Sequence, residues 1–144
     1  MNIIIANDHA AVELKIAVMQ HLTDNNVNVE DLGATDGEKA DYPDKARELC
    51  QKVTAGGYDF GILLCGTGAG MCMTANKIRG IRAVLCSEPY TAPQSRSHND
   101  ANVLCIGARV VGEGMAKMIV DAFVATPFEG GRHSGRIAKI ESSV

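Results

Sequence analysis

The sequence has no tryptophan, and aromatic residues make up only 4% of it, so its core must be built from aliphatic side chains, alanine and methionine. No apolar run approaches the roughly 18 residues of a membrane-spanning helix, and the first residues do not resemble a signal peptide. Lysine and arginine are not in excess, because the formal net charge is −3. We therefore expect a cytoplasmic protein whose partners include neither nucleic acid nor a membrane.

Cysteine occurs five times without a C-x-x-C pair. The odd number argues against a disulfide framework, and the spacing argues against a structural zinc site. The chain has 144 residues, 46% of them hydrophobic, which is long enough for one core and short for two. We predict a single domain over residues 1–144, in which residues 127–144 form a C-terminal arm or helix.

Short apolar runs alternate along the chain with stretches of helical periodicity. The expected strands cover residues 2–6, 27–32, 62–64, 81–86 and 103–106. The expected helices cover residues 10–22, 42–55, 71–78, 91–100 and 115–124. Strands that alternate with helices through short loops predict an α/β fold, a Rossmann-like three-layer α/β/α sandwich on a five-stranded parallel sheet.

The most informative stretch is residues 60–77, FGILLCGTGAGMCMTANK. A strand ends at Cys65, a loop with glycines at positions 66, 68 and 70 follows, and a helix then begins. The N–H groups of such a loop can approach an anion closely, and a thiol beside a helix N-terminus is favoured as thiolate. The helix terminus contributes only about 1 kcal/mol, so a loop N–H or Thr67 is needed as a further donor. The alternative is an inert, buried Cys65 in a structural loop.

Met71 argues against three better-known uses of a glycine-rich loop. A P-loop ends in Gly-Lys-Ser/Thr, but Gly70 is followed by Met71. The dinucleotide fingerprint fails because Met71 stands where its third glycine belongs. A cysteine phosphatase would have an arginine six positions after its cysteine, which is again position 71. We therefore expect neither nucleotide binding nor phosphate-ester hydrolysis.

Polar residues follow other expected strands, at the edge of a parallel sheet where ligands bind. Asp8 and His9 come directly after the first strand. Asp8 is a candidate ligand residue, or simply the cap of the next helix. Tyr42 lies on a connection from strand to helix, where it is able to close over a ligand or to pack half-buried.

Candidate cations gather late in the chain. Arg132 and Arg136 are four residues apart with His133 between them, so on a helix both guanidinium groups share a face that suits a phosphate. The alternative is a solvated basic tail. Arg109 follows the fifth strand, where it is able to join them. His98 ends a helix, either as a general acid or base or as a favourable charge at the helix C-terminus.

Several sequence blocks occur together and in order over nearly the whole chain. They are DH at 8–9, DYP at 41–43, CGTGAG at 65–70, ANK at 75–77, CSEPY at 86–90, HND at 98–100, GARVVG at 107–112 and EGGRH at 129–133. Taken together, these blocks resemble the B-type ribose-5-phosphate isomerases of the ribose/galactose isomerase family. The resemblance favours the functional interpretation of Cys65, His98 and the arginines over the structural one.

The resemblance implies an aldose–ketose isomerase that interconverts ribose 5-phosphate and ribulose 5-phosphate through an enediolate, without metal or organic cofactor. Cys65 is then the base that moves a proton between C1 and C2, and Thr67 and His98 assist ring opening. The expected enediolate donors are the N–H groups of Gly66, Gly68 and Gly70. The expected sugar contacts are Asp8, Tyr42 and Asn99, and the expected phosphate contacts are His9, Arg109, Arg132 and Arg136.

In the family, the pocket lies between two subunits, which implies a homodimer, with pairing into tetramers left open. Some relatives carry a carboxylate base at the position of Met71, which cannot ionise, so the role falls to Cys65 here. Asn7 and Ala11 depart from the usual family pattern, and Asn7 bears on the substrate preference because it is next to the expected pocket. A hexose 6-phosphate such as allose or galactose 6-phosphate stays an alternative substrate, because loop depth and not the motifs would decide the length of the sugar. Two rival functions also stay open: a non-catalytic phosphate-binding module of the flavodoxin type, and a cysteine-nucleophile hydrolase.

Overall fold

The computed structural model describes residues 1–142, and its centre is a sheet of five parallel strands in the order β2-β1-β3-β5-β4. The strands are β1 (Asn2–Asn7), β2 (Asn28–Asp31), β3 (Phe60–Cys65), β4 (Ala83–Leu85) and β5 (Val103–Gly107). The predicted five-stranded parallel sheet is confirmed. Residues 143 and 144, the end of the predicted C-terminal arm, lie outside the described residues.

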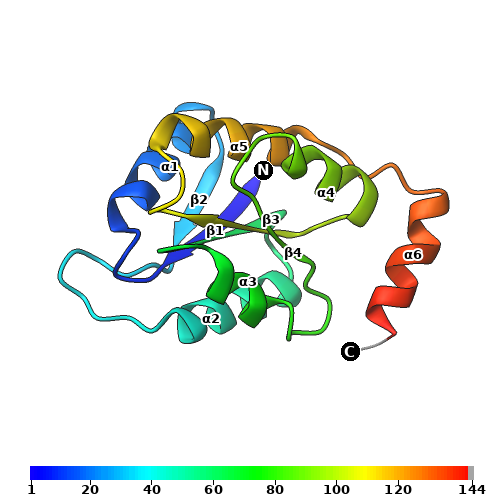
Figure 1. Ribbon diagram of the computed structural model, residues 1–144, viewed down its shortest axis with the longest axis horizontal. Helices are drawn as coiled ribbons and strands as arrows, with labels where there is room; N and C mark the ends of the chain where they lie inside the picture. Colours follow the sequence, from blue (N-terminus) through cyan, green and yellow to red (C-terminus); the bar gives the residue numbers. More distant parts are fainter. Residues whose placement is uncertain (143–144) are drawn as a thin grey trace.

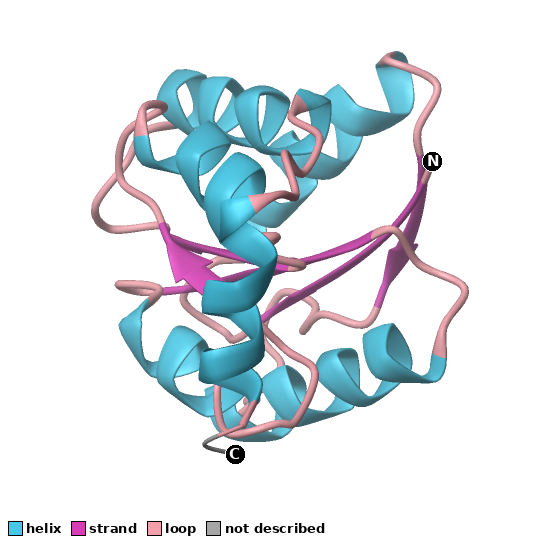
Figure 2. Cartoon of the chain, turned by 90° about the vertical axis from the view of Figure 1, so that its right-hand side faces the viewer, coloured by secondary structure: helices cyan, strands magenta, loops and turns pink. Residues whose placement is uncertain are grey.

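Helices cover both faces of this sheet, which confirms the predicted three layers (Figure 1). They are α1 (Val12–Asp24), α2 (Tyr42–Ala55), α3 (Ala69–Ala75), α4 (Thr91–Asn99), α5 (Glu113–Ala125) and α6 (Arg132–Glu141). Helices α1, α4 and α5 lie on one face, and α2 and α3 lie on the other. Helix α6 stands apart from both layers and crosses in front of one edge of the sheet (Figure 2). None of the helices in residues 1–142 is long and apolar enough to cross a membrane.

The central strands are apolar on both sides because helices cover both faces. In β1, Ile3 and Ile5 pack into one core cluster together with residues of α1 and α5. Ile4 and Ala6 point to the other face and pack with residues of α2 and α3. The side-chain period of two along a strand therefore supplies both cores from one short run.

Several predicted boundaries differ from the structure by one to three residues, and two of the differences lie beside polar or glycine-rich turns. Helix α3 begins at Ala69 rather than at residue 71, because Gly68 has a left-handed φ of +77° and turns the chain sharply. Asp8 does not cap α1, which begins at Val12 after Ala11. Instead, the Asp8 carboxylate accepts a hydrogen bond of 2.9 Å from the Ala10 N–H and holds the turn before the helix.

The glycine-rich loop lies directly against the end of β5, which requires a glycine there. A Cβ on Gly107 would lie 2.6 Å from the backbone carbonyl carbon and oxygen of Thr67. Cys65 and Gly107 are paired across the sheet, so the loop turns back over its own strand end. The missing side chain of Gly107 therefore sets how close the loop can come to the sheet.

We predict that Gly107→Ala lowers the free energy of unfolding by about 1–3 kcal/mol, because the added methyl group overlaps backbone that cannot rotate away. Gly114→Ala is the matched control, since Gly114 lies in α5 and its Cβ would meet nothing within 4 Å. That control should gain up to about 1 kcal/mol from helix propensity. Urea unfolding measures both variants, and equal stabilities would contradict the close approach described above.

Candidate active site

Cys65 ends β3 beneath the glycine-rich loop, and only 4% of its surface is exposed. The Gly68 N–H donates a hydrogen bond of 3.1 Å to its Sγ. A loop N–H is therefore in contact with the sulfur, whereas the Thr67 hydroxyl accepts a hydrogen bond from the Ala69 N–H at 3.3 Å.

Two other predicted site residues lie against the loop. The Tyr42 ring, at the start of α2, lies against Gly70. A Cβ added to Gly70 would be only 2.7 Å from this ring. The Arg109 N–H donates to the carbonyl of Gly66 at 3.0 Å, and its guanidinium group lies beside that glycine. Both side chains are thus held at the loop by glycines that leave room for them.

Asp8 and His9 lie beside this loop because β1 and β3 are neighbours in the sheet. The Asp8 N–H donates to the carbonyl of Leu64 at 3.1 Å, one residue before Cys65. His9 is exposed, and its Nδ1 lies 3.3 Å from the carbonyl of Ala40. A cleft of about 510 Å³ separates His9 from Arg109, which is a volume suited to a small metabolite.

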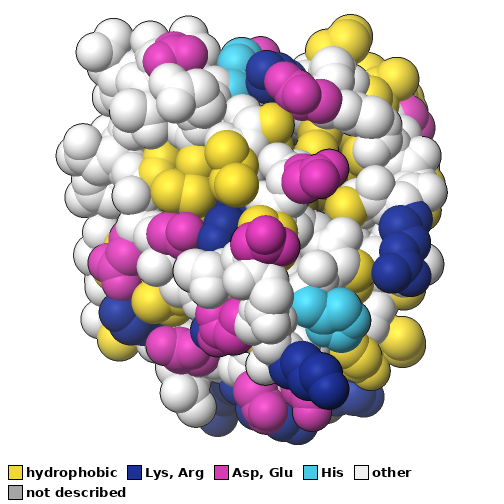
Figure 3. All heavy atoms as spheres, turned by 90° about the vertical axis from the view of Figure 1, so that its left-hand side faces the viewer, with side chains coloured by type: hydrophobic (Ala, Val, Ile, Leu, Met, Phe, Trp, Pro, Cys, Tyr) yellow, Lys and Arg dark blue, Asp and Glu magenta, His cyan; other side chains and the backbone are white. Residues whose placement is uncertain are grey.

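The same cleft also holds acidic side chains, among them Glu13, Asp36 and Glu113. Figure 3 looks onto this end of the molecule, and acidic, basic and hydrophobic side chains alternate across it without one broad basic area. A phosphate bound here would therefore depend on a few discrete cations. Among the described residues that line the cleft, His9 and Arg109 are the two that can carry a positive charge.

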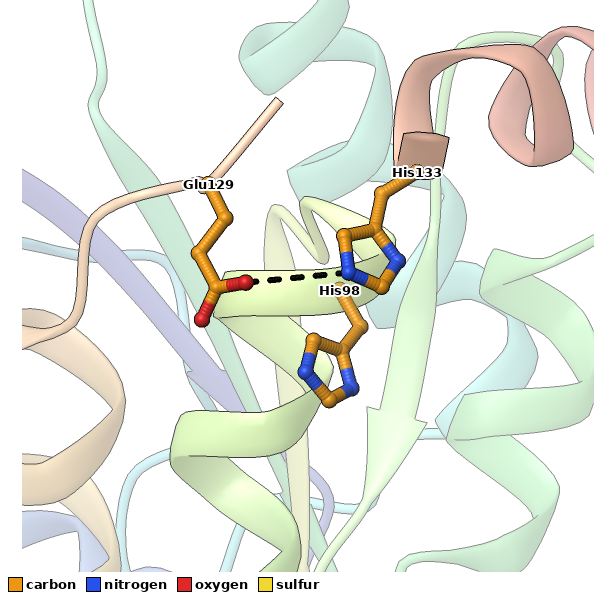
Figure 4. Close-up of side chains that lie close together, drawn as sticks. All are labelled: His98, Glu129 and His133. Atoms are coloured by element: carbon orange, nitrogen blue, oxygen red, sulfur yellow. Dashed lines mark ion pairs between the residues drawn. The ribbon is translucent and has the colours of Figure 1, made fainter. Parts of the chain in front are cut away.

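The remaining predicted residues form a second group. His98 and Asn99 end α4, while Arg132 and Arg136 are exposed on α6, which is helical as the shared-face interpretation requires. The His98 ring stacks on the ring of His133, with centroids 4.4 Å apart and planes 14° from parallel (Figure 4). No role for His133 was predicted from the sequence.

His133 is nearly buried, with 4% of its surface exposed, and its Nε2 lies 3.7 Å from the Glu129 carboxylate. Burial lowers the pKa of His133, and the nearby positive charges of His98, Arg132 and Arg136 lower it further. The Glu129 carboxylate acts in the opposite direction. The cluster thus combines a buried imidazole with several cationic neighbours and one carboxylate.

The group around Cys65 and the group around His98 lie at opposite ends of the parallel strands. Asn102, just after α4, accepts a hydrogen bond from the Gly61 N–H at the start of β3, whereas Cys65 ends that strand. Gly61 and Cys65 are four strand residues apart, or about 13 Å. Figure 1 shows α6 and the glycine-rich loop on opposite sides of the molecule. One chain therefore does not bring His98 and the tail arginines to Cys65.

Cys72 is a thiol with a lowered pKa that was not singled out from the sequence. A hydrogen bond with Cys105 and another from Asn76 lower the pKa of Cys72 to about 7, against the opposing effect of burial. Asn76 Nδ2 lies 3.6 Å from its Sγ. Cys72 and Asn76 are four residues apart, and this spacing is the one sequence signal that could have indicated their contact. By contrast, burial raises the pKa of Cys50 and of Cys86 to about 12.

A model of the Ribose/Galactose Isomerase family matches residues 3–140. The chain belongs to this family. The chain is 50% identical to ribose-5-phosphate isomerase B of Escherichia coli over 133 residues, which cover 92% of this chain and 89% of that protein. The family expected from the sequence blocks is thereby confirmed.

Two solved structures of the family extend the comparison. Ribose-5-phosphate isomerase B of Clostridium thermocellum is 43% identical, with a TM-score of 0.97 over 99% of this chain and 97% of that one. The enzyme of Mycoplasma genitalium with bound ribulose-5-phosphate is 44% identical, with a TM-score of 0.93 over 99% and 95% of the two chains. The family fold therefore holds over the whole matched length.

We predict that iodoacetamide near pH 7 modifies Cys72 ahead of Cys50, Cys86 and Cys105, and that the rate for Cys72 rises as the pH increases through about 7. The reason is that the thiolate reacts, and the pKa values of the other three thiols are raised. Peptide mass spectrometry follows each site. In Asn76→Ala the profile of Cys72 should move to higher pH, and an unchanged profile would contradict the assigned hydrogen bond.

Proposed function

We propose that the protein is an aldose–ketose isomerase that interconverts ribose 5-phosphate and ribulose 5-phosphate. The observation that carries the proposal is the Cys65 sulfur, which accepts the Gly68 N–H at the end of a strand beneath a glycine-rich loop. Family membership and the relative with bound ribulose-5-phosphate support the same substrate. We further propose that the enzyme acts in the cytoplasm.

In the proposed reaction, the substrate ring opens first, assisted by Thr67 and His98. The Cys65 thiolate then removes the proton from C2 of the aldose, and the electron pair of the C–H bond moves to the carbonyl to give an enediolate. The sulfur returns the proton to C1 while the hydroxyl proton of O2 passes to the oxyanion on O1, so that O2 becomes the ketone oxygen and O1 a hydroxyl group. The N–H groups of Gly66 and Gly70 are the donors proposed to stabilise the developing oxyanion, while that of Gly68 is held by the sulfur.

We propose that two copies of the chain complete each site. The separation of His98 and the tail arginines from Cys65 supports this arrangement, because neither edge of one chain carries all the groups that the reaction needs. Cys65, Thr67, Asp8, His9 and Arg109 would come from one subunit. Asn99, His98, Arg132 and Arg136 would come from the partner subunit, with α6 as the arm that carries the arginines across.

The phosphate would then be bound by His9 and Arg109 of one subunit and by Arg132 and Arg136 of the other. Guanidinium groups suit this role because each offers a planar set of donors to the phosphate oxygens. Asp8, Tyr42 and Asn99 would contact the sugar hydroxyls. The residues 1–144 would act as a single catalytic domain whose C-terminal arm serves the neighbouring subunit.

The proposal is tested by incubating the protein with ribose 5-phosphate in deuterated water. Formation of ribulose 5-phosphate with deuterium at the exchanged carbon would support proton transfer through the enediolate. Turnover of allose or galactose 6-phosphate in preference to the pentose would overturn the substrate. Phosphate binding without turnover, or trapping of a covalent intermediate on a cysteine, would overturn the reaction.

We predict that Cys65→Ala lowers the turnover number by about 10²- to 10⁴-fold, because the general base is removed. The Michaelis constant should change far less, since the phosphate contacts remain. Cys72→Ser is the matched thiol control and should retain turnover. If Cys65→Ala kept near-normal turnover, the sulfur would not be the base.

We also predict that two inactive variants restore activity when their subunits are mixed. A homodimer of Cys65→Ala lacks the base in both of its sites, and a homodimer of His98→Gln lacks the histidine in both. A mixed dimer rebuilds one complete site of two, so random exchange should recover about a quarter of the wild-type activity. No recovery after verified subunit exchange would show that Cys65 and His98 do not act across subunits.

A further inference from the structure

Three groups that commonly bind transition metals meet beside α6: His98, Glu129 and His133. The nitrogen and oxygen atoms that they offer all lie within 4.8 Å of one another. They come from the end of α4, the segment before α6 and the first turn of α6, and their side chains approach one another from these three places (Figure 4). The cluster is therefore assembled by the docking of α6 and not by one local sequence motif.

The Nε2 atom of His133 is an unpartnered polar atom in this cluster. It is buried, and it has no hydrogen-bond partner among the described residues 1–142. The Glu129 carboxylate faces it at 3.7 Å, which is too long for a hydrogen bond. A buried nitrogen without a partner is costly, so its position beside a carboxylate that it does not reach points to a missing ligand.

We propose that His98, Glu129 and His133 form a binding site for Zn²⁺ or a similar late first-row divalent cation, and that the bound cation inhibits the isomerase. Two imidazoles and one carboxylate are a ligand set that binds zinc in proteins and leaves a fourth position open. Imidazole ligands favour such metals over Mg²⁺ and Ca²⁺, which prefer oxygen. The inhibitory part of this inference rests on the proposed function.

The three side chains need to move only locally to bind a tetrahedral cation. Zinc bonds of about 2.0–2.1 Å in a tetrahedron place ligand atoms about 3.4 Å apart. Nε2 of His133 and the Glu129 oxygen are already 3.7 Å apart. The His98 ring must leave its stacked position and turn a nitrogen toward the other two groups. His98 is half-buried and Glu129 is exposed at its side chain, so both side chains have room to move.

The backbone holds the three residues together. The Glu129 N–H donates to the carbonyl of Ser97 at 3.0 Å, next to His98 in the sequence. The His133 N–H donates to the carbonyl of Gly130 at 3.1 Å, so the turn that starts α6 fixes the spacing of Glu129 and His133. The backbone positions of the three residues are therefore preorganised, and a cation would have to order only the His98 and Glu129 side chains.

Occupation of this site would stop the proposed reaction at ring opening. The metal takes the lone pair of a His98 nitrogen, which then cannot accept or donate the proton that ring opening requires. The neighbouring Arg132 and Arg136 are not ligands of the cation, so sugar-phosphate binding and cation binding would compete for His98 and not for the phosphate contacts. We expect full recovery when a chelator removes the cation.

Metal binding is tested on metal-free protein with Zn²⁺ by calorimetry and with Co²⁺ as a visible-absorption probe. We expect one cation per chain with a spectrum of nitrogen and oxygen ligands, free of the thiolate absorption that the cysteines would give. Glu129→Gln should weaken binding at least about tenfold, because one charged ligand is lost. His21→Gln is the matched control, since His21 pairs with Asp121 away from the cluster and should leave affinity unchanged.

Activity assays separate this inference from the proposed function. We expect Zn²⁺ to inhibit the wild type reversibly, and Glu129→Gln to need at least about ten times more Zn²⁺ for the same inhibition. No binding, or equal binding by Glu129→Gln, would overturn the site. Binding without inhibition would overturn its inhibitory role. An absence of isomerase activity in metal-free protein would overturn the proposed function, while the Co²⁺ spectrum would still report on the site.

Discussion

The close contact between the glycine-rich loop and the ends of β3 and β5 determines the surroundings of the Cys65 sulfur. A Cβ on Gly68 would lie 2.5 Å from the Leu85 side chain and 2.9 Å from the carbonyl carbon of Ile106. Only a glycine fits there with a left-handed φ of +77°, and its backbone N–H donates to the Cys65 sulfur. The same residue therefore makes the turn and supplies the hydrogen bond. The side chains of Tyr42 and Arg109 are then positioned against the neighbouring glycines of the loop.

The fold could be predicted because its central strands are buried on both faces. Continuous apolar runs such as IIIA and GILL can be recognised as buried strands. Their alternation with helical stretches allows only a few topologies for the sheet. The boundaries of α1 and α3 were less accurate, because they depend on particular turns. Asp8 holds a turn before α1 instead of capping it, and Gly68 starts α3 early. Such details depend on backbone conformation, which residue type only restricts.

The candidate site was predictable in composition and less so in arrangement. Cys65 and Arg109 follow parallel strands, so their meeting at one edge follows from the topology. His98 ends a helix that runs back from that edge, which is why it lies at the other one. The burial of His133 depends on how α6 docks against α4, and no local pattern encodes that contact. Cys72 was missed because its partner Cys105 lies in a distant strand.

The charges around the His98–His133 pair would act in opposite ways on the sugar phosphate and on a divalent cation, although the two would compete only for His98. Arg132 and Arg136 surround a buried imidazole whose pKa they help to lower, so the cluster carries unrelieved positive charge. A phosphate relieves that repulsion, whereas a divalent cation adds to it, and Glu129 supplies the compensating carboxylate in the cluster. Screening by salt weakens the repulsion among exposed charges. The balance between the two ligands should therefore shift toward the cation as ionic strength rises and phosphate falls.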